Sequence, residues 1–500
     1  MAAVSGPGIS PPPSGPAGPA ADPRRWLALG VIATAQLMVV LDASIVTIAL
    51  PSAQHALSIS VADRQWVLTA YTLSFGGLLL LGGRIADYAG RKTIFIIGLL
   101  GFAGASALGG AAIDAGMLLG ARALQGAFAA LLAPAALSLI TVTFVEVKER
   151  ATAFAVYGAI SGGGVAIGLI AGGVLTEYAS WRWCLLVNAP LAVVAAVAAV
   201  PVVRESKSAV RTGYDASGAV TVTAGLAALV YGFAKAASGG WASVGTLAFL
   251  GAAVALLAAF VIIELRAEHP LLPMRVVLER NRGGSFLSSL MAAASLLGMF
   301  LFLTYYFQGT LGYSPLKSGF AFLPFSAGII AAAAAAGRLL PRAAPRLLAT
   351  AGLGGAILGM LWLSRVTPRS SYAARVLPAE ILLSLGMGLA LVVLSSTALY
   401  RVPARDAGVA SALVNATQQV GNSLGIALLN TVAASATAAY AAGHAPGRAA
   451  AAAAQVHGYA VGFLAGAGFL TAALLSALFL ITAPRAGLTD AGGVPGEAVV

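Results

Sequence analysis

The sequence predicts an all-α integral membrane protein with fourteen transmembrane helices, and two observations carry this prediction. Of the 500 residues, 59% are hydrophobic and 9% are charged, whereas soluble domains average about 25% charged residues. Apolar runs of about 20 residues, the length that crosses a bilayer core, recur along the whole chain. The mean hydropathy of +0.91 agrees with a chain that is not built for water.

The spans are expected at residues 26–50, 65–83, 93–113, 116–140, 151–176, 184–203, 215–236, 242–264, 284–307, 319–340, 347–366, 376–398, 408–434 and 458–482. With both chain ends cytoplasmic, the cytoplasmic segments hold twenty Lys and Arg, the outer segments hold eight, and Arg122 lies inside a span. Such an excess marks the cytoplasmic face. We therefore expect a multi-pass protein of the cytoplasmic membrane, and the heavy use of Ala, Gly and Arg suggests a high-GC bacterium.

Fourteen spans divide as six, two and six. We expect two cytoplasmic tails (1–25, disordered, and 483–500), two six-helix halves (26–203 and 284–482), and two additional transmembrane helices with cytoplasmic connectors between the halves (204–283). Residues 337–346 repeat the loop between spans 2 and 3 without its aspartate, which favours two related halves that face a midplane site. The stretch 266–282 is either an amphipathic connector on the inner face or an unstructured basic loop.

Several classes of function are excluded by what the chain lacks. The single Cys184 leaves no intramolecular disulfide and no cysteine-based metal site. The four histidines fall in predicted loops without ligand spacing, so no metal is expected. The cations lie beside spans without interleaved aromatic residues, so we expect no nucleic-acid partner. The chain has no nucleotide-binding loop, so we expect no enzymatic activity and no cofactor, with an ion gradient supplying the energy.

A charged turn between spans 2 and 3 is the most informative segment. It contains Gly83, Asp87, Gly90, Arg91 and Lys92. The glycines would let two helix ends approach closely, and the aspartate could meet a helix N-terminus or a cation. The segment resembles the loop motif of the major facilitator superfamily, where it acts as a conformational latch. The alternative is a chance cluster of interfacial charges.

Further motifs follow in the order that one branch of this family uses. They are Leu41 to Pro51 at the end of span 1, Gln65 to Tyr71 in span 2, Arg122 to Gly126 in span 4, and the segments 181–183 and 188–190 around the start of span 6. Together with fourteen spans, they resemble the EmrB/QacA-type drug:proton antiporters. That resemblance implies proton-driven efflux of a hydrophobic or cationic drug, in some members an antibiotic that the host itself makes.

Span 5 departs from this family in one residue. The antiporter motif of the family carries a Gly-Pro pair followed by Gly-Gly, and here Gly168, Gly172 and Gly173 match it while Leu169 replaces the proline. Gly164 lies one turn earlier. The glycines still permit close helix packing, but the proline kink has no source. The departure weakens the inference to antiport and leaves the inference to a transporter unchanged.

Asp42 in span 1 and Arg122 in span 4 are the candidates for proton coupling. A carboxylate inside a span costs several kcal/mol unless it is paired or hydrated. Both residues lie about 12–13 Å from the outer ends of their spans at 1.5 Å per residue. The family resemblance implies that spans 1 and 4 both line the cavity, so the two charges are expected close enough to pair. The alternative is a static ion pair that fixes helix packing. Of the other acidic residues, Glu380 is expected near the outer interface, and Glu264 is expected to snorkel at the inner one.

Polar residues on one face of span 13 suggest a substrate wall. Asn415, Gln418 and Asn422 recur at i, i+3 and i+7, and Tyr305 and Gln308 end span 9. Interhelical hydrogen bonding and an interfacial aromatic belt are the respective alternatives. We expect a small hydrophobic or cationic substrate, the lipid bilayer as partner and a monomer. The rival functions are proton-coupled uptake of a small nutrient and a non-transporting membrane sensor on the same fold.

Overall fold

The computed structural model describes residues 24–61, 63–144, 146–207, 215–268, 270–403, 406–445 and 447–484. The two predicted tails lie almost entirely outside these residues. Within them, fourteen helices are long and apolar enough to cross a membrane. The predicted number of spans is therefore confirmed, and with it the all-α membrane fold.

Several spans are built from two consecutive helical segments. The first eight spans are α1 (Arg25–Ala56), α2 (Trp66–Ala89), α3 (Arg91–Gly110), α4 (Ala115–Thr143), α5 (Val147–Tyr178), α6 with α7 (Trp183–Leu186, Asn188–Val202), α8 (Ala216–Gly239) and α9 (Val244–Arg266). The short α10 (Met274–Val277) follows. The last six are α11 with the π-helix η1 (Arg280–Tyr305, Tyr306–Thr310), α12 with α13 (Pro315–Ala321, Leu323–Leu339), α14 (Pro345–Leu363), the π-helix η2 with α15 (Tyr372–Val376, Leu377–Ala398), α16 (Ala407–Ala442) and α17 (Arg448–Leu480).

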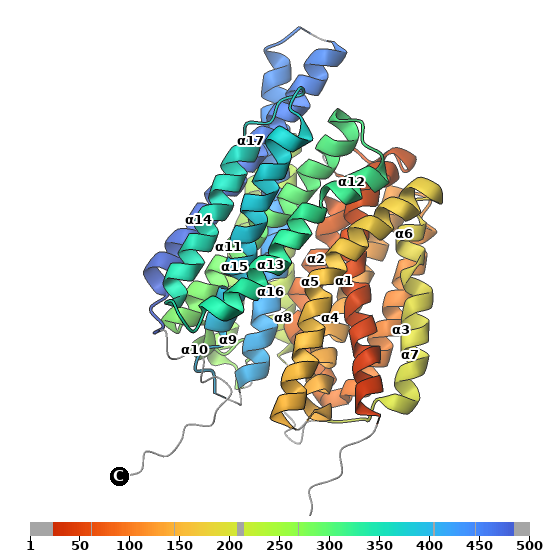
Figure 1. Ribbon diagram of the computed structural model, residues 1–500, viewed down its shortest axis with the longest axis vertical. Coiled ribbons are helices and arrows are strands. Elements are labelled where there is room, and N and C mark those ends of the chain that lie inside the picture. The colour runs from red at the N-terminus through yellow and green to blue at the C-terminus, as the bar shows by residue number, and fades with distance from the viewer. Residues whose placement is uncertain are drawn as a thin grey trace, which may run out of the picture.

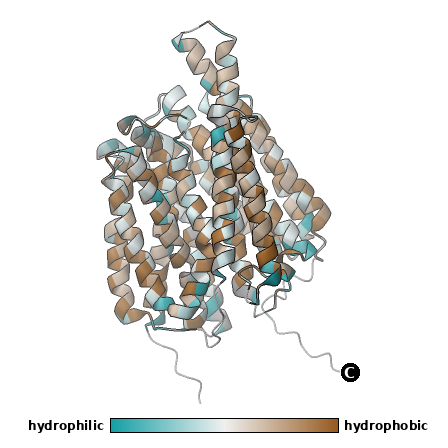
Figure 2. Cartoon of the chain, turned by 180° about the vertical axis from the view of Figure 1, so that it is seen from behind, coloured by the Kyte–Doolittle hydropathy of each residue, from teal (hydrophilic) through white to brown (hydrophobic). Residues whose placement is uncertain are grey.

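The helices form two bundles. Helices α1–α7, here called the N-terminal bundle, pack mainly on one another, and α11–α17, the C-terminal bundle, do the same. Helices α8 and α9 pair with each other, and α8 contacts α2 and α16. Figure 1 shows the first bundle in red to yellow beside the second in green to blue. Polar residues gather at the two ends of the molecule in Figure 2, as a bilayer requires.

The start of α1 and the end of α17 lie at the same end of the molecule (Figure 1). We call this the predicted cytoplasmic end and the opposite one the predicted outer end. Described hydrogen bonds between the bundles gather in the predicted outer half. Gln308 Nε2 donates to the carbonyl of Ile48 at 3.0 Å, Tyr305 donates to Gln54, and the Leu316 amide donates to Glu177 at 3.0 Å.

Residues 270–279, which lead into α11, form a connector that packs on the helices, in agreement with the first of our two alternatives. Its side chains Leu271 and Val276 are buried, and Val276 packs with Phe286 and Leu413. The Arg84 guanidinium donates to the carbonyl of Pro270 at 2.9 Å. The connector therefore touches both bundles.

Glu264 helps to hold this connector, and the prediction that it snorkels was wrong. It is 3% exposed, and its Oε2 accepts the backbone amide of Leu272 at 2.9 Å. The fold thus buries this carboxyl group and holds one of its oxygens with an amide of the returning chain, while Oε1 has no hydrogen-bond partner among the described residues.

Helices α16 and α17 run past the predicted span ends at 434 and 458 and meet in a hairpin at the top of Figure 1. The extension is rich in alanine, the strongest helix former, so the helices continue beyond the apolar stretch. His457 therefore lies in α17, where we had expected a loop. His55, also expected in a loop, lies in the last turn of α1. Among the described residues no group of three or more His, Cys, Asp and Glu side chains could hold a metal ion.

Candidate functional site

Asp42 and Arg122 form an ion pair at the centre of the N-terminal bundle, as predicted. The Arg122 Nη1 lies 2.5 Å from Asp42 Oδ2, and the two side chains are 1% and 0% exposed. The Arg122 Nε donates to the carbonyl of Val67 on α2 at 3.0 Å, and its guanidinium lies 4.5 Å from the Tyr71 ring centroid. The pair thus ties α1, α2 and α4 together.

Three further polar side chains complete the surroundings of Asp42. Gln125 Nε2 and Asn188 Nδ2 each donate to Asp42 Oδ1 at 3.0 Å, and Ser106 accepts from both amides at 3.0 and 3.4 Å. All three side chains are 0% exposed. With one arginine and two amides as donors, both oxygens of Asp42 are satisfied, which offsets much of the cost of a buried charge. Sequence reasoning missed these roles, although amides inside spans were the available signal.

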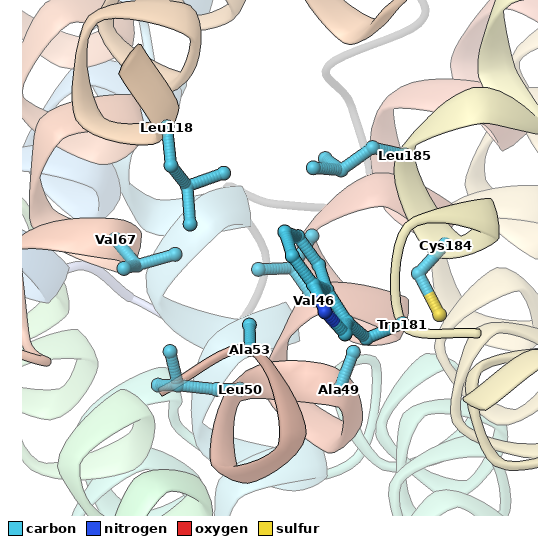
Figure 3. Close-up of a pocket in the computed structure, with 9 residues that line it drawn as sticks. All are labelled: Val46, Ala49, Leu50, Ala53, Val67, Leu118, Trp181, Cys184 and Leu185. Atoms are coloured by element: carbon cyan, nitrogen blue, oxygen red, sulfur yellow. The ribbon is translucent and has the colours of Figure 1, made fainter. Parts of the chain in front are cut away.

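A small apolar cavity lies on the predicted outer side of this network, and Figure 3 shows the side chains that line it. Val46 and Leu118 lie one helical turn outward from Asp42 and Arg122, and the cavity that they line with Trp181 encloses only about 10 Å³. That volume corresponds to about one water position, and an apolar lining offers water no partner.

The turn predicted to be a latch has only one residue outside helices, Gly90 between α2 and α3. The Arg91 Nη2 lies 2.8 Å from Asp87 Oδ1, an i,i+4 ion pair with the Asp87 side chain 42% exposed. Gly90 has φ +117°, which favours glycine, and a Cβ there would meet the Glu205 carboxyl group at 2.8 Å. Lys92 Nζ donates to the carbonyl of Val200 at 2.6 Å.

Gly83 does not provide the close helix approach that we expected from it. A Cβ on Gly83 would make an ordinary 3.4 Å contact with Pro134, whereas one on Gly82 would lie 2.1 Å from the Ala130 carbonyl oxygen. Gly82, one residue before Gly83, is therefore the glycine at which α2 approaches α4 closely. Sequence alone does not give the rotation of a helix to this accuracy.

Glu205, which sequence analysis did not single out, caps the N-terminus of α3. Its carboxylate accepts the backbone amides of Lys92 and Thr93 at 3.1 Å each and the Thr93 hydroxyl at 2.6 Å. Partial burial raises the pKa of Glu205, but the hydrogen bonds from Thr93 and the backbone amides of Ser206, Thr93 and Lys92 outweigh it and hold the pKa below its ordinary value.

The glycines of the span 5 motif pack against two different helices. A Cβ on Gly164, Gly168 or Gly172 would lie 2.7–3.0 Å from atoms of α1, and one on Gly173 would lie 2.6 Å from Leu316 of α12. Gly164, Gly168 and Gly172 lie on successive turns of α5 and allow it to approach α1 closely along the stretch that contains Asp42. Gly173 instead lies where the two bundles meet.

The five residues predicted to contact substrate fall into two groups. Asn415 is exposed and Gln418 and Asn422 are half-buried on one face of α16, while the adjacent face packs on α2, where Ser423 donates to Thr72 at 2.7 Å. The first three therefore remain a predicted substrate wall.

Tyr305 and Gln308 bridge the two bundles at the predicted outer end instead. Arg64, which we had not selected, lies 3.8 Å from the Tyr305 ring centroid.

We had expected Glu380 near the outer interface, and this prediction was wrong. Glu380 is 0% exposed within the C-terminal bundle, and Tyr372 OH lies 3.4 Å from its Oε2. The π-helical η2 lengthens the helix on its predicted outer side, which places Glu380 deeper than its distance from Pro378 suggested.

Two six-helix bundles, a buried charged pair between the first and fourth spans and a one-residue turn after the second define a membrane transporter. The chain belongs to the Major Facilitator Superfamily, whose family model matches residues 32–426.

It is 52% identical over 458 residues to a puromycin resistance protein of Streptomyces alboniger, covering 91% of each chain. It is 38% identical to a cephamycin export protein of Amycolatopsis lactamdurans over 82% of this chain and 85% of the other. The fold is similar to a bacterial homologue of the human lysosomal transporter Spinster in an inward-facing conformation (TM-score 0.65, 17% identity, 94% and 98% covered).

Proposed function

We propose that this protein exports a hydrophobic or cationic antibiotic-like molecule across the bacterial cytoplasmic membrane in exchange for protons. The predicted cytoplasmic end faces the cell interior, and the transporter works as a monomer. Kinship with antibiotic resistance and export proteins supports the direction of transport and the class of substrate. A puromycin-like amine is the first compound to test, because the first relative named above is a puromycin resistance protein.

The observation that carries proton coupling is the buried Asp42–Arg122 pair. Asp42 is the carboxylate that α1, α4 and α7 surround together, with Arg122, Gln125 and Asn188 as its donors. A movement that separates α1 from α4 removes the arginine and leaves a buried carboxylate that must take up a proton. Return of Arg122 expels that proton, so a change of conformation becomes a change of protonation.

Substrate enters from the predicted cytoplasmic end and lies against the partly exposed face of α16 that carries Asn415, Gln418 and Asn422. Amide groups bind polar parts of a drug without selecting one charge, and the apolar helices around them suit a hydrophobic body. Asp87 and Arg91 act as a latch that exchanges partners as the bundles move.

Reconstituted transport tests the proposal. In proteoliposomes with an imposed pH gradient, we expect the wild-type protein to accumulate a fluorescent or radiolabelled puromycin analogue against its concentration gradient. Asp42→Asn removes the titratable group and keeps its size, so gradient-driven accumulation should vanish while binding of a neutral substrate persists. Glu268→Gln, at an exposed position on the connector, is the matched control and should transport normally.

The result that contradicts proton coupling at Asp42 is accumulation by the Asn variant that still follows the pH gradient. Accumulation in the direction of the proton flux would instead indicate uptake of a nutrient. A protein that binds the drug and never moves it would indicate a sensor.

A further inference from the structure

The C-terminal bundle contains a buried carboxyl group that the proposed mechanism does not use. Glu380 lies eight residues after the start of η2, or about 12 Å along the helix at 1.5 Å per residue. Within the part of the chain that the structure describes, its Oε1 has no hydrogen-bond partner. Asp42 has three donors including an arginine, and Glu380 has no cation.

The charged and titratable groups on the elements around Glu380 are engaged elsewhere. Arg375 of η2 lies 5.9 Å from the Trp362 ring centroid on α14, and Lys317 of α12 lies 4.0 Å from that of Tyr313. The Tyr306 hydroxyl of η1 lies 2.9 and 3.1 Å from two backbone carbonyl oxygens, which share its one proton. The arginines of α11, α13 and α14 lie at the predicted cytoplasmic ends of those helices. An ionised carboxylate in these surroundings would be uncompensated, so the neutral acid is the stable form.

The hydrogen bonds of Tyr372 agree with a neutral Glu380. Tyr372 OH lies 2.8 Å from the carbonyl oxygen of Ala321 and 3.4 Å from Glu380 Oε2. A phenol has one proton, and a backbone carbonyl can only accept. When the phenol proton goes to Ala321, the proton for the longer contact has to come from the carboxyl group.

Ala321 connects this site to the contact between the bundles. It is the last residue of α12, and α12 packs on α5 of the N-terminal bundle. A Cβ on Gly319 would lie 2.4 Å from the carbonyl oxygen of Leu169. The partner of Tyr372 therefore moves when α12 leaves α5. Tyr372 itself lies on a π-helix, a form that is frequent at functional sites.

We propose that Glu380 is a proton-binding site that closes the predicted outer end of the transporter. Neutral Glu380 stabilises the conformation in which α12 is docked on α5 and Tyr372 donates to Ala321. When α12 leaves α5, Tyr372 turns its hydroxyl proton toward Glu380 Oε2, the O–H bond of the carboxyl group breaks, and its proton passes to water. Uptake of one proton from outer water reverses these steps and favours closure. The inference rests on the proposed function only in assigning this closure to an export cycle.

Spin-label distances test closure without any substrate. Labels are placed at Tyr178→Cys on α5 and Phe320→Cys on α12, positions that are 73% and 51% exposed, in a Cys184→Ser background in lipid nanodiscs. In this background we expect the short-distance population to fall as the pH rises. Glu380→Gln mimics the neutral acid, so its population should stay short at every pH. Glu268→Gln should follow the parent protein.

Infrared difference spectroscopy provides the second readout. The band of a protonated carboxyl group should be present in the docked state and absent from Glu380→Gln. Should Glu380→Gln fail to fold, Glu380→Asp keeps the titratable group and should shift both that band and the pH midpoint of closure. A parent protein whose distance does not depend on pH overturns the inference. So does pH dependence that survives Glu380→Gln, or an unshifted midpoint in Glu380→Asp.

Neither readout involves export, so its outcome is separate from that of the transport assay. Loss of drug accumulation with a pH-dependent distance would reject the proposed substrate or coupling and leave the proton site in place. Normal export with a pH-independent distance would support the proposed substrate and coupling and reject the proton site at Glu380.

Discussion

The two bundles bury acidic residues in opposite ways. In the N-terminal bundle, Asp42 receives an arginine and two amides from α4 and α7. In the C-terminal bundle, the hydroxyl of Tyr372 is the one hydrogen-bond partner of the Glu380 side chain among the residues that the structure describes. A low-dielectric interior tolerates a charge only when donors surround it, and otherwise it favours the neutral acid. The comparison shows that burial alone does not set the charge of an acid, because its partners decide the outcome.

The largest effect expected from this comparison follows from removing the arginine. Arg122→Met leaves the Asp42 carboxylate buried without a counter-charge, and the free energy of unfolding should fall by about 3–5 kcal/mol. The double variant Asp42→Asn, Arg122→Met removes both charges and should recover most of that loss. Thermal unfolding in detergent measures both. Equal losses in the single and double variants would show that Arg122 acts through packing and not through its charge.

Glycines near the predicted cytoplasmic end should give a smaller difference in stability between the two bundles. Gly90 has φ +117°, and a Cβ there would meet the Glu205 carboxyl group, whereas Gly337 in the degenerate repeat has nothing within 4 Å of a Cβ. Gly90→Ala should cost about 1–3 kcal/mol in the free energy of unfolding. Gly337→Ala should be neutral or stabilising by up to about 1 kcal/mol, since alanine favours a helix.

The two glycine variants should be compared in one background by thermal unfolding and drug export. Similar melting temperatures for both would mean that Gly90, between α2 and α3, is no more constrained than Gly337 in the last turn of α13.

The smallest effect concerns the cap on α3. The hydrogen bonds from Thr93 and the backbone amides that cap α3 hold the pKa of Glu205 below its ordinary value of 4.5, so the stabilisation is present above that pH and is lost as the pH falls through the lower folded value. Glu205→Gln should cost about 0.5 kcal/mol near pH 7, because the carboxylate is exposed. The difference from wild type should disappear in acid. A difference in melting temperature that is the same at both pH values would contradict this assignment.

Much of the fold could be predicted from the sequence because the bilayer dictates the length of each apolar stretch. The pairing of Asp42 with Arg122 was also predictable, since both charges lie at a similar depth and the family resemblance implies that their spans line the same cavity. The cap from Glu205 was not, because 112 residues separate it from Thr93 and only tertiary packing brings them together. Glu380 was misplaced because hydropathy does not reveal a π-helix that lengthens its span. For Gly82 and Gly83, periodicity gave the helix but not its rotation.

The alanine-rich hairpin of α16 and α17 gives this small protein a site at which another protein can be bound or inserted for imaging. At 36 and 33 residues, the two helices measure about 54 and 50 Å at 1.5 Å per residue, against a hydrocarbon core of about 30 Å. The excess of about 20 Å over that core stands clear of a detergent belt, which would otherwise surround much of this 49.8 kDa chain. An antibody fragment raised against the hairpin, or a small domain inserted at its turn, would be held by two continuous helices. The orientation of such a fragment would report the tilt of the C-terminal bundle in single-particle images.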